Sequence, residues 1–302
     1  MTNDIVTKRK QDFADGIHTE LRQQQNKSRS VGIISGNLTS NSRSEVSGVS
    51  ARVYKDGVYG FSSMAEISDD AARSVLGAAT ENAKFMASRA GRPASIAPVA
   101  TDAVVRDCNV SDPEQKVYTE FAKELDGYIE KKYKNLSGRG VYIRCDSMEK
   151  LIAVSDGADG HTIIPRSYVY IRMTAETPSG VPVEMFEPFG GFGTFDTVFT
   201  SPESLYEKVD GVYERIMKKR EGVYAEAGER TCILSGTLAG MLAHEAVGHT
   251  VEADLVLGGS VAAHCLGKQV ASPIVNLTDF AHDAFGAPCP LPVWLDDEGV
   301  AA

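Results

Sequence analysis

The sequence predicts an α+β protein in which helices pack on a largely antiparallel sheet. Apolar stripes at helical spacing flank a block of strand-like segments between residues 140 and 185. Those four segments follow one another with short connections, as in an antiparallel meander. Asp56-Gly57, between two alternating stretches, is the strongest short signal for a hairpin. These observations together favour α+β over the all-helical or all-strand classes.

Length and composition set broad limits. The chain has 302 residues, enough for two domains. We expect an N-terminal α+β domain over 1–221, with a boundary near Glu221-Gly222. Residues 222–302 are expected to begin a second, mostly β domain that carries a motif helix and is incomplete. A net charge of −10 argues against nucleic acid or an anionic membrane as the main partner. No secretory leader or apolar run of membrane-spanning length is evident, and five scattered cysteines predict a reduced, cytoplasmic compartment.

The first third of the chain predicts a helix, a strand, a hairpin and a second helix. Ile5, Phe13, Ile17 and Leu21 recur at helical spacing, so an amphipathic helix is expected within 1–28. A strand and loop are expected within 28–47, and the hairpin within 49–62. Ser68 is expected to cap a helix that runs to about residue 90.

The rest of the chain alternates helix, strands and helix before the motif. We expect a connection with one short strand over 91–110, then a helix opened by Asp112 and Pro113. Strands are expected over 140–145, 151–155, 168–175 and 181–185, followed by a linker over 186–199. Ser201 and Pro202 open a helix that ends near residue 220. Further on, short strands are expected over 231–234 and 270–278, on either side of a helix capped by Ser235.

The segment that carries chemistry is H-E-A-V-G-H at residues 244–249. Two imidazoles and a carboxylate are the groups of a catalytic zinc site. In the common H-E-x-x-H pattern the histidines lie four residues apart on one helical face. Here they lie five apart, and on a regular α-helix they would point about 140° away from each other. A single π-type turn would align them, and Gly248 would ease that distortion. On the motif alone, a buried helix with hydrogen-bonded histidines stays open as the alternative.

A longer pattern narrows the choice. The motif is followed by T-V-E-A-D, and together they closely resemble the TldD branch of the TldD/PmbA family of zinc-dependent peptidases. The match covers His244 to His249, Glu252 and Asp254. Weaker matches are D-D-E-G at 296–299 and G-V-Y-G-F-S at 57–62. The resemblance therefore spans most of the chain.

The resemblance implies roles for these residues. His244 and His249 would bind Zn²⁺ through neutral imidazoles, and Glu245 would act as the general base. The family's third ligand is a cysteine far beyond the D-D-E-G run, so the chain is expected to be truncated. In-chain substitutes would be His264, Cys265, His282 and Cys289, none of which lies where the family has its ligand. Glu252 and Asp254 either end the helix or orient a ligand imidazole.

Two functions of different classes follow. The first is a zinc-dependent peptidase that hydrolyses unfolded or extended peptides, together with a homologous PmbA- or TldE-like subunit in a heterodimer, or as a homodimer. The second is a non-catalytic binding or regulatory protein of the same family, like the members described as gyrase modulators, with an incomplete metal site. A closed structural zinc site is disfavoured, because such sites usually show four ligands.

Overall fold

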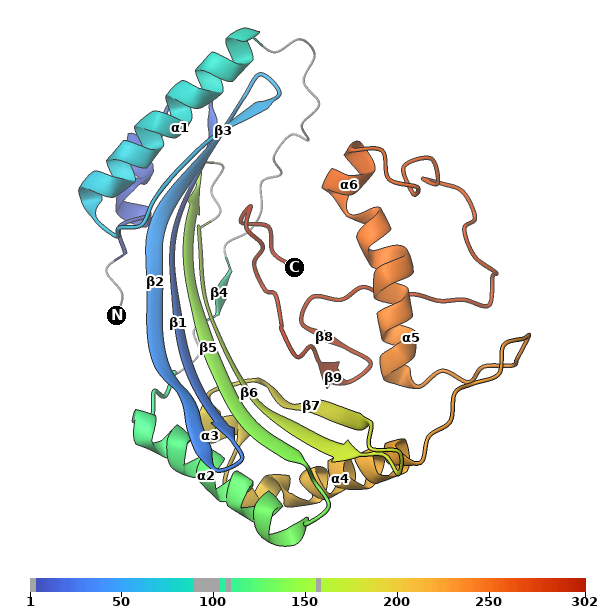
Figure 1. Ribbon diagram of the computed structural model, residues 1–302. Coiled ribbons are helices and arrows are strands. Elements are labelled where there is room, and N and C mark those ends of the chain that lie inside the picture. The colour runs from blue at the N-terminus through green and yellow to red at the C-terminus, as the bar shows by residue number, and fades with distance from the viewer. Residues whose placement is uncertain (1–3, 90–103, 107–109, 156–158) are drawn as a thin grey trace. The chain divides into compact units, whose positions relative to one another are not determined.

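The computed structural model describes residues 4–89, 104–106, 110–155 and 159–302 (Figure 1). The chain forms two compact units. The first contains the chain up to Gly222 together with 281–302, and the second contains 223–280. We describe each by itself. Residues 281–302 belong to the first unit because most of their contacts are with it. The expected domain boundary at residue 221 stays a prediction.

The first unit is built on a seven-stranded sheet. Its order is β3-β2-β1-β5-β6-β4, and β7 also pairs with β6. All neighbouring strands are antiparallel except β4, which runs parallel to β6. The strands are β1 (His18–Ile34), β2 (Asn37–Lys55), β3 (Val58–Met64), β4 (Val105–Arg106), β5 (Gly138–Val154), β6 (Asp159–Glu176) and β7 (Pro182–Phe192). The expected α+β class with a largely antiparallel sheet is confirmed.

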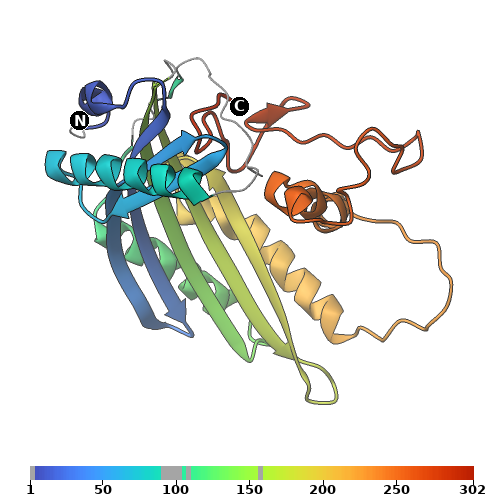
Figure 2. The same ribbon diagram turned by 90° about the horizontal axis from the view of Figure 1, so that it is seen from above.

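The helices of this unit cover one face of the sheet (Figures 1 and 2). Leu21 of β1 lies in a core cluster with α1, whereas Val31 and Ile33 of the same strand lie in a cluster with α2 and α4. Positions an even number of residues apart on a strand point to the same side, so both clusters lie on one face. The helical elements are η1 (Thr7–Asp12), α1 (Asp69–Arg89), α2 (Gln115–Lys132), α3 (Phe195–Val198), η2 (Pro202–Leu205) and α4 (Tyr206–Arg220).

Several local signals act as expected. Asp56 and Gly57 have φ of 47° and 85° and join β2 to β3, as a two-residue hairpin turn requires. The Ser68 hydroxyl accepts the N–H of Ala71 at 3.1 Å and caps α1. Gly60 lets α1 contact β3 directly, since a Cβ there would lie 2.1 Å from the Ala79 carbonyl oxygen.

Three expectations for the first unit are wrong. The amphipathic helix expected within 1–28 is not formed: among the described residues 4–28 only 7–12 are helical, and β1 begins at His18. Pairing with β2 along the whole strand, and with β5 from Glu20 to Ile34, overrides the helical spacing of the apolar residues. The expected strands 140–145 and 151–155 are one continuous strand, β5. The first half of the expected linker 186–199 belongs to β7, and α3 occupies 195–198.

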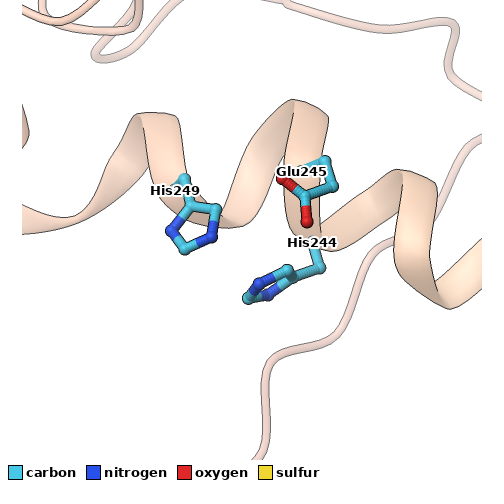
Figure 3. Close-up of side chains that lie close together, drawn as sticks. All are labelled: His244, Glu245 and His249. Carbon is cyan, nitrogen blue, oxygen red and sulfur yellow. The ribbon is translucent and has the colours of Figure 1, made fainter.

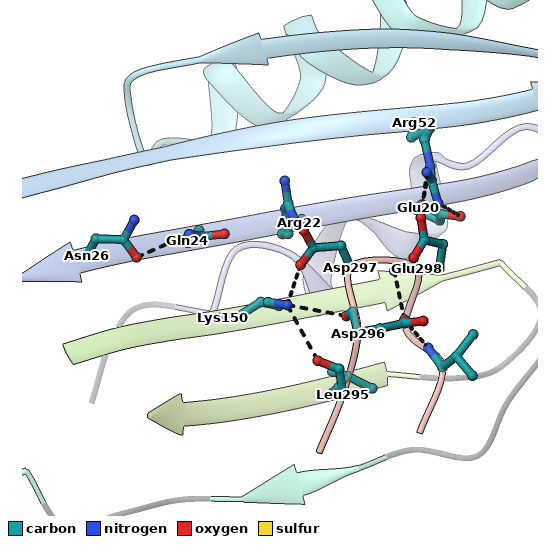
Figure 4. A network of polar contacts seen from close by, with 11 residues as sticks. Glu20, Arg22, Gln24, Asn26, Arg52, Lys150, Leu295, Asp296, Asp297 and Glu298 are labelled. Atoms are coloured by element: carbon teal, nitrogen blue, oxygen red, sulfur yellow. Dashed lines mark hydrogen bonds and ion pairs between the residues drawn. The ribbon is translucent and has the colours of Figure 1, made fainter. Parts of the chain in front are cut away.

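The uncovered face of the sheet holds the segment 295–300 (Figure 4). The Lys150 side chain, 5% exposed, donates from Nζ to the carbonyl oxygens of Leu295 (3.5 Å) and Asp296 (3.3 Å) and to the Asp297 carboxylate. Arg22 pairs with Asp297 at 2.9 Å. Leu295 is 2% exposed and packs against Ile152 and Val154. One buried ammonium group thus fixes a segment about 145 residues away in sequence.

Further ion pairs extend this contact toward the edge of the sheet. Arg52 pairs with Glu298 at 2.8 Å and with both carboxylate oxygens of the buried Glu20, at 2.8 and 3.0 Å. Asp296 accepts the N–H groups of Glu298 and Val300 and closes a tight turn. The D-D-E-G carboxylates of this unit are therefore engaged in ion pairs and turn hydrogen bonds.

The second unit consists of helical pieces and loops. Its elements are α5 (Gly236–Ala243), the π-helical turn η3 (His244–Gly248), the 3₁₀ turn η4 (His249–Val251) and α6 (Ala253–Leu257). Residues 223–280, all of them described, contain no strand and no buried residue. The strands expected at 231–234 and 270–278 are wrong, because no neighbouring strand is there to pair with them. Strands β8 (Asp283–Ala284) and β9 (Ala287–Pro288) form a two-stranded ribbon in the first unit. No described helix has the length and apolar content needed to cross a bilayer.

Replacing Lys150 by Met should release 295–300 from the sheet. The substitution keeps the length of the side chain but leaves two carbonyl groups and Asp297 without their donor. We expect the free energy of unfolding to fall by about 1–3 kcal/mol. Trp294, the single tryptophan, packs on Phe192 at 5.3 Å and should report the loss by fluorescence during urea unfolding. Lys116→Met, at an exposed position of α2, is the control. Equal effects of the two substitutions would contradict this role of Lys150.

The same contact should weaken in acid. Burial raises the pKa of Asp297, but the hydrogen bonds and charges of Lys150 and Arg22 outweigh it and hold the pKa below its ordinary value. The ionised form is therefore favoured in the folded state. Its stabilisation is present above about pH 4 and is lost as the pH falls through the lowered pKa. The gap in unfolding free energy between the wild type and Asp297→Asn should stay constant above about pH 5 and narrow as the pH falls below about 4. A gap that stays constant into this acid range would contradict the assignment.

Candidate metal centre

The helix that carries the motif begins at a side-chain cap. The Ser235 hydroxyl accepts the N–H of Leu238 at 3.3 Å, as its position before the helix predicts. The regular α-helix α5 continues to Ala243, and its geometry changes at the first residue of the motif. The cap fixes where the helix starts, and so which residues fall in the altered turn.

Residues 244–248 form a single π-helical turn. The N–H of His249 donates to the carbonyl oxygen of His244, which is an i→i+5 hydrogen bond. The wider turn brings the two imidazoles to the same side of the helix, with ring centroids 4.3 Å apart (Figure 3). The π-type turn expected from the spacing of the histidines is confirmed. Gly248 keeps ordinary right-handed helical angles, and a Cβ there would lie 3.6 Å from Nδ1 of His244.

His244, Glu245 and His249 together can hold a metal ion. One possible ligand atom from each lies within 4.8 Å of those of the other two. Ligands of a tetrahedral zinc ion at 2.0–2.1 Å lie about 3.3 Å from each other, so modest side-chain rotations suffice. Two imidazole nitrogens and one carboxylate also suit zinc chemically. The residues fit the metal that the motif implies.

The substitute ligands considered from the sequence do not join this group. Across residues 4–89, 104–106, 110–155 and 159–302, the set of three metal-binding side chains brought together is His244, Glu245 and His249. His264 and Cys265 belong to the same unit but lie outside the set. His282 Nδ1 contacts the Asp283 carboxylate at 2.6 Å, and the Cys289 thiol donates to the carbonyl of Leu291 at 3.3 Å.

Glu252, which the sequence predicted either to end the helix or to orient a ligand imidazole, contacts the imidazole of His249. Nδ1 of His249 lies 2.6 Å from Oε1 of Glu252. Because a carboxylate only accepts, Nδ1 carries the proton in this contact and Nε2 keeps its lone pair free for a metal. Asp254 instead accepts the N–H of Leu255 at 2.9 Å, at the start of α6. The two acids therefore have different roles: Glu252 lies beside a candidate ligand, and Asp254 lies at the start of a helix.

The site is open to solvent in the described residues. The side chains of His249 and Glu252 are each 49% exposed, and His244 and Glu245 are exposed as well. Leu238, Met241 and Leu242, on the apolar part of the same helix, are about half exposed. The alternative left open by the motif, a buried helix with hydrogen-bonded histidines, is therefore not what the structure shows, because both imidazoles are exposed.

Comparison with known families identifies the family to which the chain belongs. Three family models match the chain: PmbA/TldA metallopeptidase domain 1 over residues 19–83, the central domain over 107–234, and the C-terminal domain over 227–302. The chain belongs to the PmbA/TldD family of metallopeptidases. The third model includes both the π-helical turn and the segment anchored by Lys150.

Two curated relatives of this PmbA/TldD protein are archaeal. A metalloprotease of Methanocaldococcus jannaschii is 32% identical over 155 residues, which are 50% of this chain and 32% of the relative. A zinc metalloprotease TldD homolog of Saccharolobus solfataricus is 36% identical over 87 residues, 29% of this chain and 19% of the relative. The matched stretches therefore span a third of these relatives or less.

Solved structures show the same fold. TldE of Thermococcus kodakarensis has a TM-score of 0.65 at 15% identity, covering 97% of this chain and 64% of that one. A Bacteroides thetaiotaomicron protein named as a candidate modulator of DNA gyrase has a TM-score of 0.67 at 14% identity, covering 97% and 66%. At this level of identity the likeness concerns the fold alone.

Removing the Glu252 carboxylate should weaken metal binding. Glu252→Ala frees the His249 ring to rotate and to change tautomer, so we expect the Kd for Zn²⁺ to rise about 10–100-fold. Glu252→Gln keeps an acceptor oxygen and should recover most of that loss. Competition with a chromogenic chelator measures both variants, with His249→Ala as the reference for a lost ligand and Asp254→Asn as the matched control. Equal affinities of Glu252→Ala and the wild type would contradict the orienting role.

Proposed function

We propose that this protein is a zinc-dependent peptidase of the TldD type. The observation that supports the proposal is the π-helical turn that gathers His244, Glu245 and His249 within one family fold. A helix that only packs in a core gains nothing from a wider turn, and such turns occur mostly at functional sites. The metalloprotease names of the relatives agree with it.

The chain's own residues divide the work. His244 and His249 hold the zinc, and Glu252 keeps the His249 ring in the tautomer with a free Nε2. Zinc supplies two effects in such a site, acidification of a water molecule and polarisation of the scissile carbonyl. Glu245 accepts the proton of the attacking water and passes it to the leaving amine, so that a neutral amine departs. A third protein ligand is usual for catalytic zinc, and the TldD resemblance implies a cysteine thiolate.

The substrate and the partner follow from the same resemblance. We propose unfolded or extended peptides as substrates, in the cytoplasm, and a TldE-like subunit as the partner. The fold shared with Thermococcus TldE supports a pairing of two related chains. The net charge of −10 makes strongly acidic peptides poor substrates at low ionic strength.

Replacing Glu245 by Gln is the direct test. The amide cannot take up a proton, so peptide hydrolysis should fall at least about 100-fold, which is the usual contribution of a general base. Zinc binding should be unchanged within about twofold, because the two imidazoles remain. Cleavage of an unfolded casein or a fluorogenic peptide is measured with the chain alone and with a TldE-like subunit, before and after chelation.

The controls separate the two classes of function. His249→Ala should lose both zinc and cleavage, whereas Glu245→Asp should keep zinc and part of the rate. Undiminished turnover by Glu245→Gln would overturn the assignment of the base. Full zinc binding without any cleavage, alone or with the partner, would favour the non-catalytic regulatory function instead.

A further inference from the structure

The helix-covered face of the sheet holds a cavity that the metal centre does not use. The cavity has a volume of about 150 Å³, and every residue that lines it belongs to the first unit. Side chains of β1, β2, β5 and β6 form its floor, and residues from the segments 110–118 and 194–195 form its walls. An engineered apolar cavity of about 150 Å³ in another protein takes up benzene, so the space suits a ligand with a ring of about six atoms.

The register of the sheet brings the floor of this cavity together. Directly opposite residues on neighbouring strands point to the same face of a sheet. Cys145 belongs to the core cluster formed with α2, so its row of residues and the next row on the same side both face the helices. The first row consists of Arg43, Arg29, Cys145 and Ser167, and the second of Lys27, Ser147 and Pro165. Backbone pairing therefore fixes the floor of the cavity.

The inner part of the cavity is aromatic and uncharged. The rings of Tyr118 and Phe195, each 3% exposed, lie 4.6 Å apart and form one wall. Burial raises the pKa of the Cys145 thiol to about 11, so the thiol is neutral at physiological pH. The Ser167 hydroxyl donates to the carbonyl oxygen of Gly193 at 3.0 Å. An apolar group that enters this part displaces water from the two rings and separates no charge from its partner.

The mouth of the cavity carries three cations. The Arg29 guanidinium donates to the Asp112 carboxylate at 2.5 Å and to the Gln115 side chain at 2.9 Å. Arg43 lies 3.7 Å from the same carboxylate. Lys27 is exposed, and its ammonium group makes no ion pair or hydrogen bond with any residue that the structure describes. Two of the cations thus share Asp112, and Lys27 keeps its donors available.

The acids around the mouth leave one positive charge in excess. Glu45 lies opposite Lys27 in the register, but its carboxylate accepts the Gln25 amide at 2.6 Å. Asp146 points to the other face of the sheet, because it follows Cys145 on β5. Asp112 and Glu45 therefore oppose three cations. Such an excess at a cavity, in a chain of net charge −10, favours a ligand with a single negative charge.

We propose that this cavity binds a small organic carboxylate. The apolar part of the ligand lies against Tyr118, Phe195 and Pro165. Its carboxylate accepts charge-assisted hydrogen bonds from the Lys27 ammonium group and a hydrogen bond from the Ser147 hydroxyl. A phosphate would bring nearly two negative charges to one unpaired cation and would gain nothing from the aromatic wall. The proposal does not depend on peptidase activity, because no residue of the metal centre takes part.

Titration with 4-fluorobenzoate, followed by fluorine NMR of the ligand, measures the affinity directly. We expect a Kd of about 0.1–1 mM, which is ordinary for a ligand of about ten non-hydrogen atoms. The neutral analogue 4-fluorobenzamide has the same ring and nearly the same size. It should bind at least about tenfold more weakly, because it brings no negative charge to Lys27.

Substitutions around the cavity test how the ligand is oriented. Lys27→Met should raise the Kd of 4-fluorobenzoate at least about tenfold and remove its advantage over the amide, whereas Lys27→Arg should keep most of the affinity. Ser147→Leu fills space beside Pro165 and should weaken the binding of both compounds. Arg144→Met removes an exposed cation from the opposite face of β5, and as the matched control it should leave both Kd values unchanged.

Each outcome decides the proposal. Binding that requires both the ammonium group of Lys27 and the negative charge of the ligand supports it. Equal affinities for the acid and the amide, or an unchanged Kd in Lys27→Met, would overturn it, because the carboxylate then lies elsewhere. Displacement of 4-fluorobenzoate by an equal concentration of inorganic phosphate would indicate a site for any oxyanion and would overturn the organic ligand. An absence of binding to the folded wild type up to about 10 mM overturns it as well. Far-UV circular dichroism of each variant confirms that the sheet is intact before the comparison.

Discussion

Two imidazoles five residues apart can bind one ion only if the helix between them accepts an i→i+5 hydrogen bond. The candidate centre depends on that single bond, from the N–H of His249 to the carbonyl of His244. With a regular turn, the imidazoles would diverge and only Glu245 and His249 would share a face. The same widened turn leaves Glu252 one turn beyond His249, within reach of its Nδ1. One change of backbone geometry therefore sets both the metal-binding side chains and the group that orients one of them.

In the first unit, the helices cover only one face of the sheet. Polar side chains that are buried on the other face must therefore find partners elsewhere in the chain, as Lys150 does. A lysine ammonium group that is almost fully buried needs anionic or carbonyl partners. Its partners come from Leu295, Asp296 and Asp297, at the far end of the sequence. The anchored segment thereby becomes part of the sheet's core instead of a trailing loop.

The sequence predicted best those features that depend on residues close together in the chain. The turn at Asp56-Gly57 and the caps at Ser68 and Ser235 depend on neighbouring residues alone. The π-helical turn was also predictable, because it follows from the spacing of the histidines. Strand β1 was not, since helix or strand there is decided by pairing with distant strands. The anchoring by Lys150 and the choice between Glu252 and Asp254 required coordinates, because side-chain contacts fix them.

Two acidic runs carry the family resemblance, and their physical roles differ. In the run after the motif, Glu252 faces an exposed imidazole and changes which nitrogen can bind a metal. In the D-D-E-G run, Asp297 and Glu298 are neutralised by Arg22, Lys150 and Arg52. A carboxylate already paired with one or two cations is a poor metal ligand, because binding would first have to break those pairs. Both acidic runs lie in the family motifs, so the motifs do not tell their roles apart. The charged groups around each acid do: Glu252 belongs to the candidate metal centre, whereas Asp297 and Glu298 belong to the structural anchor.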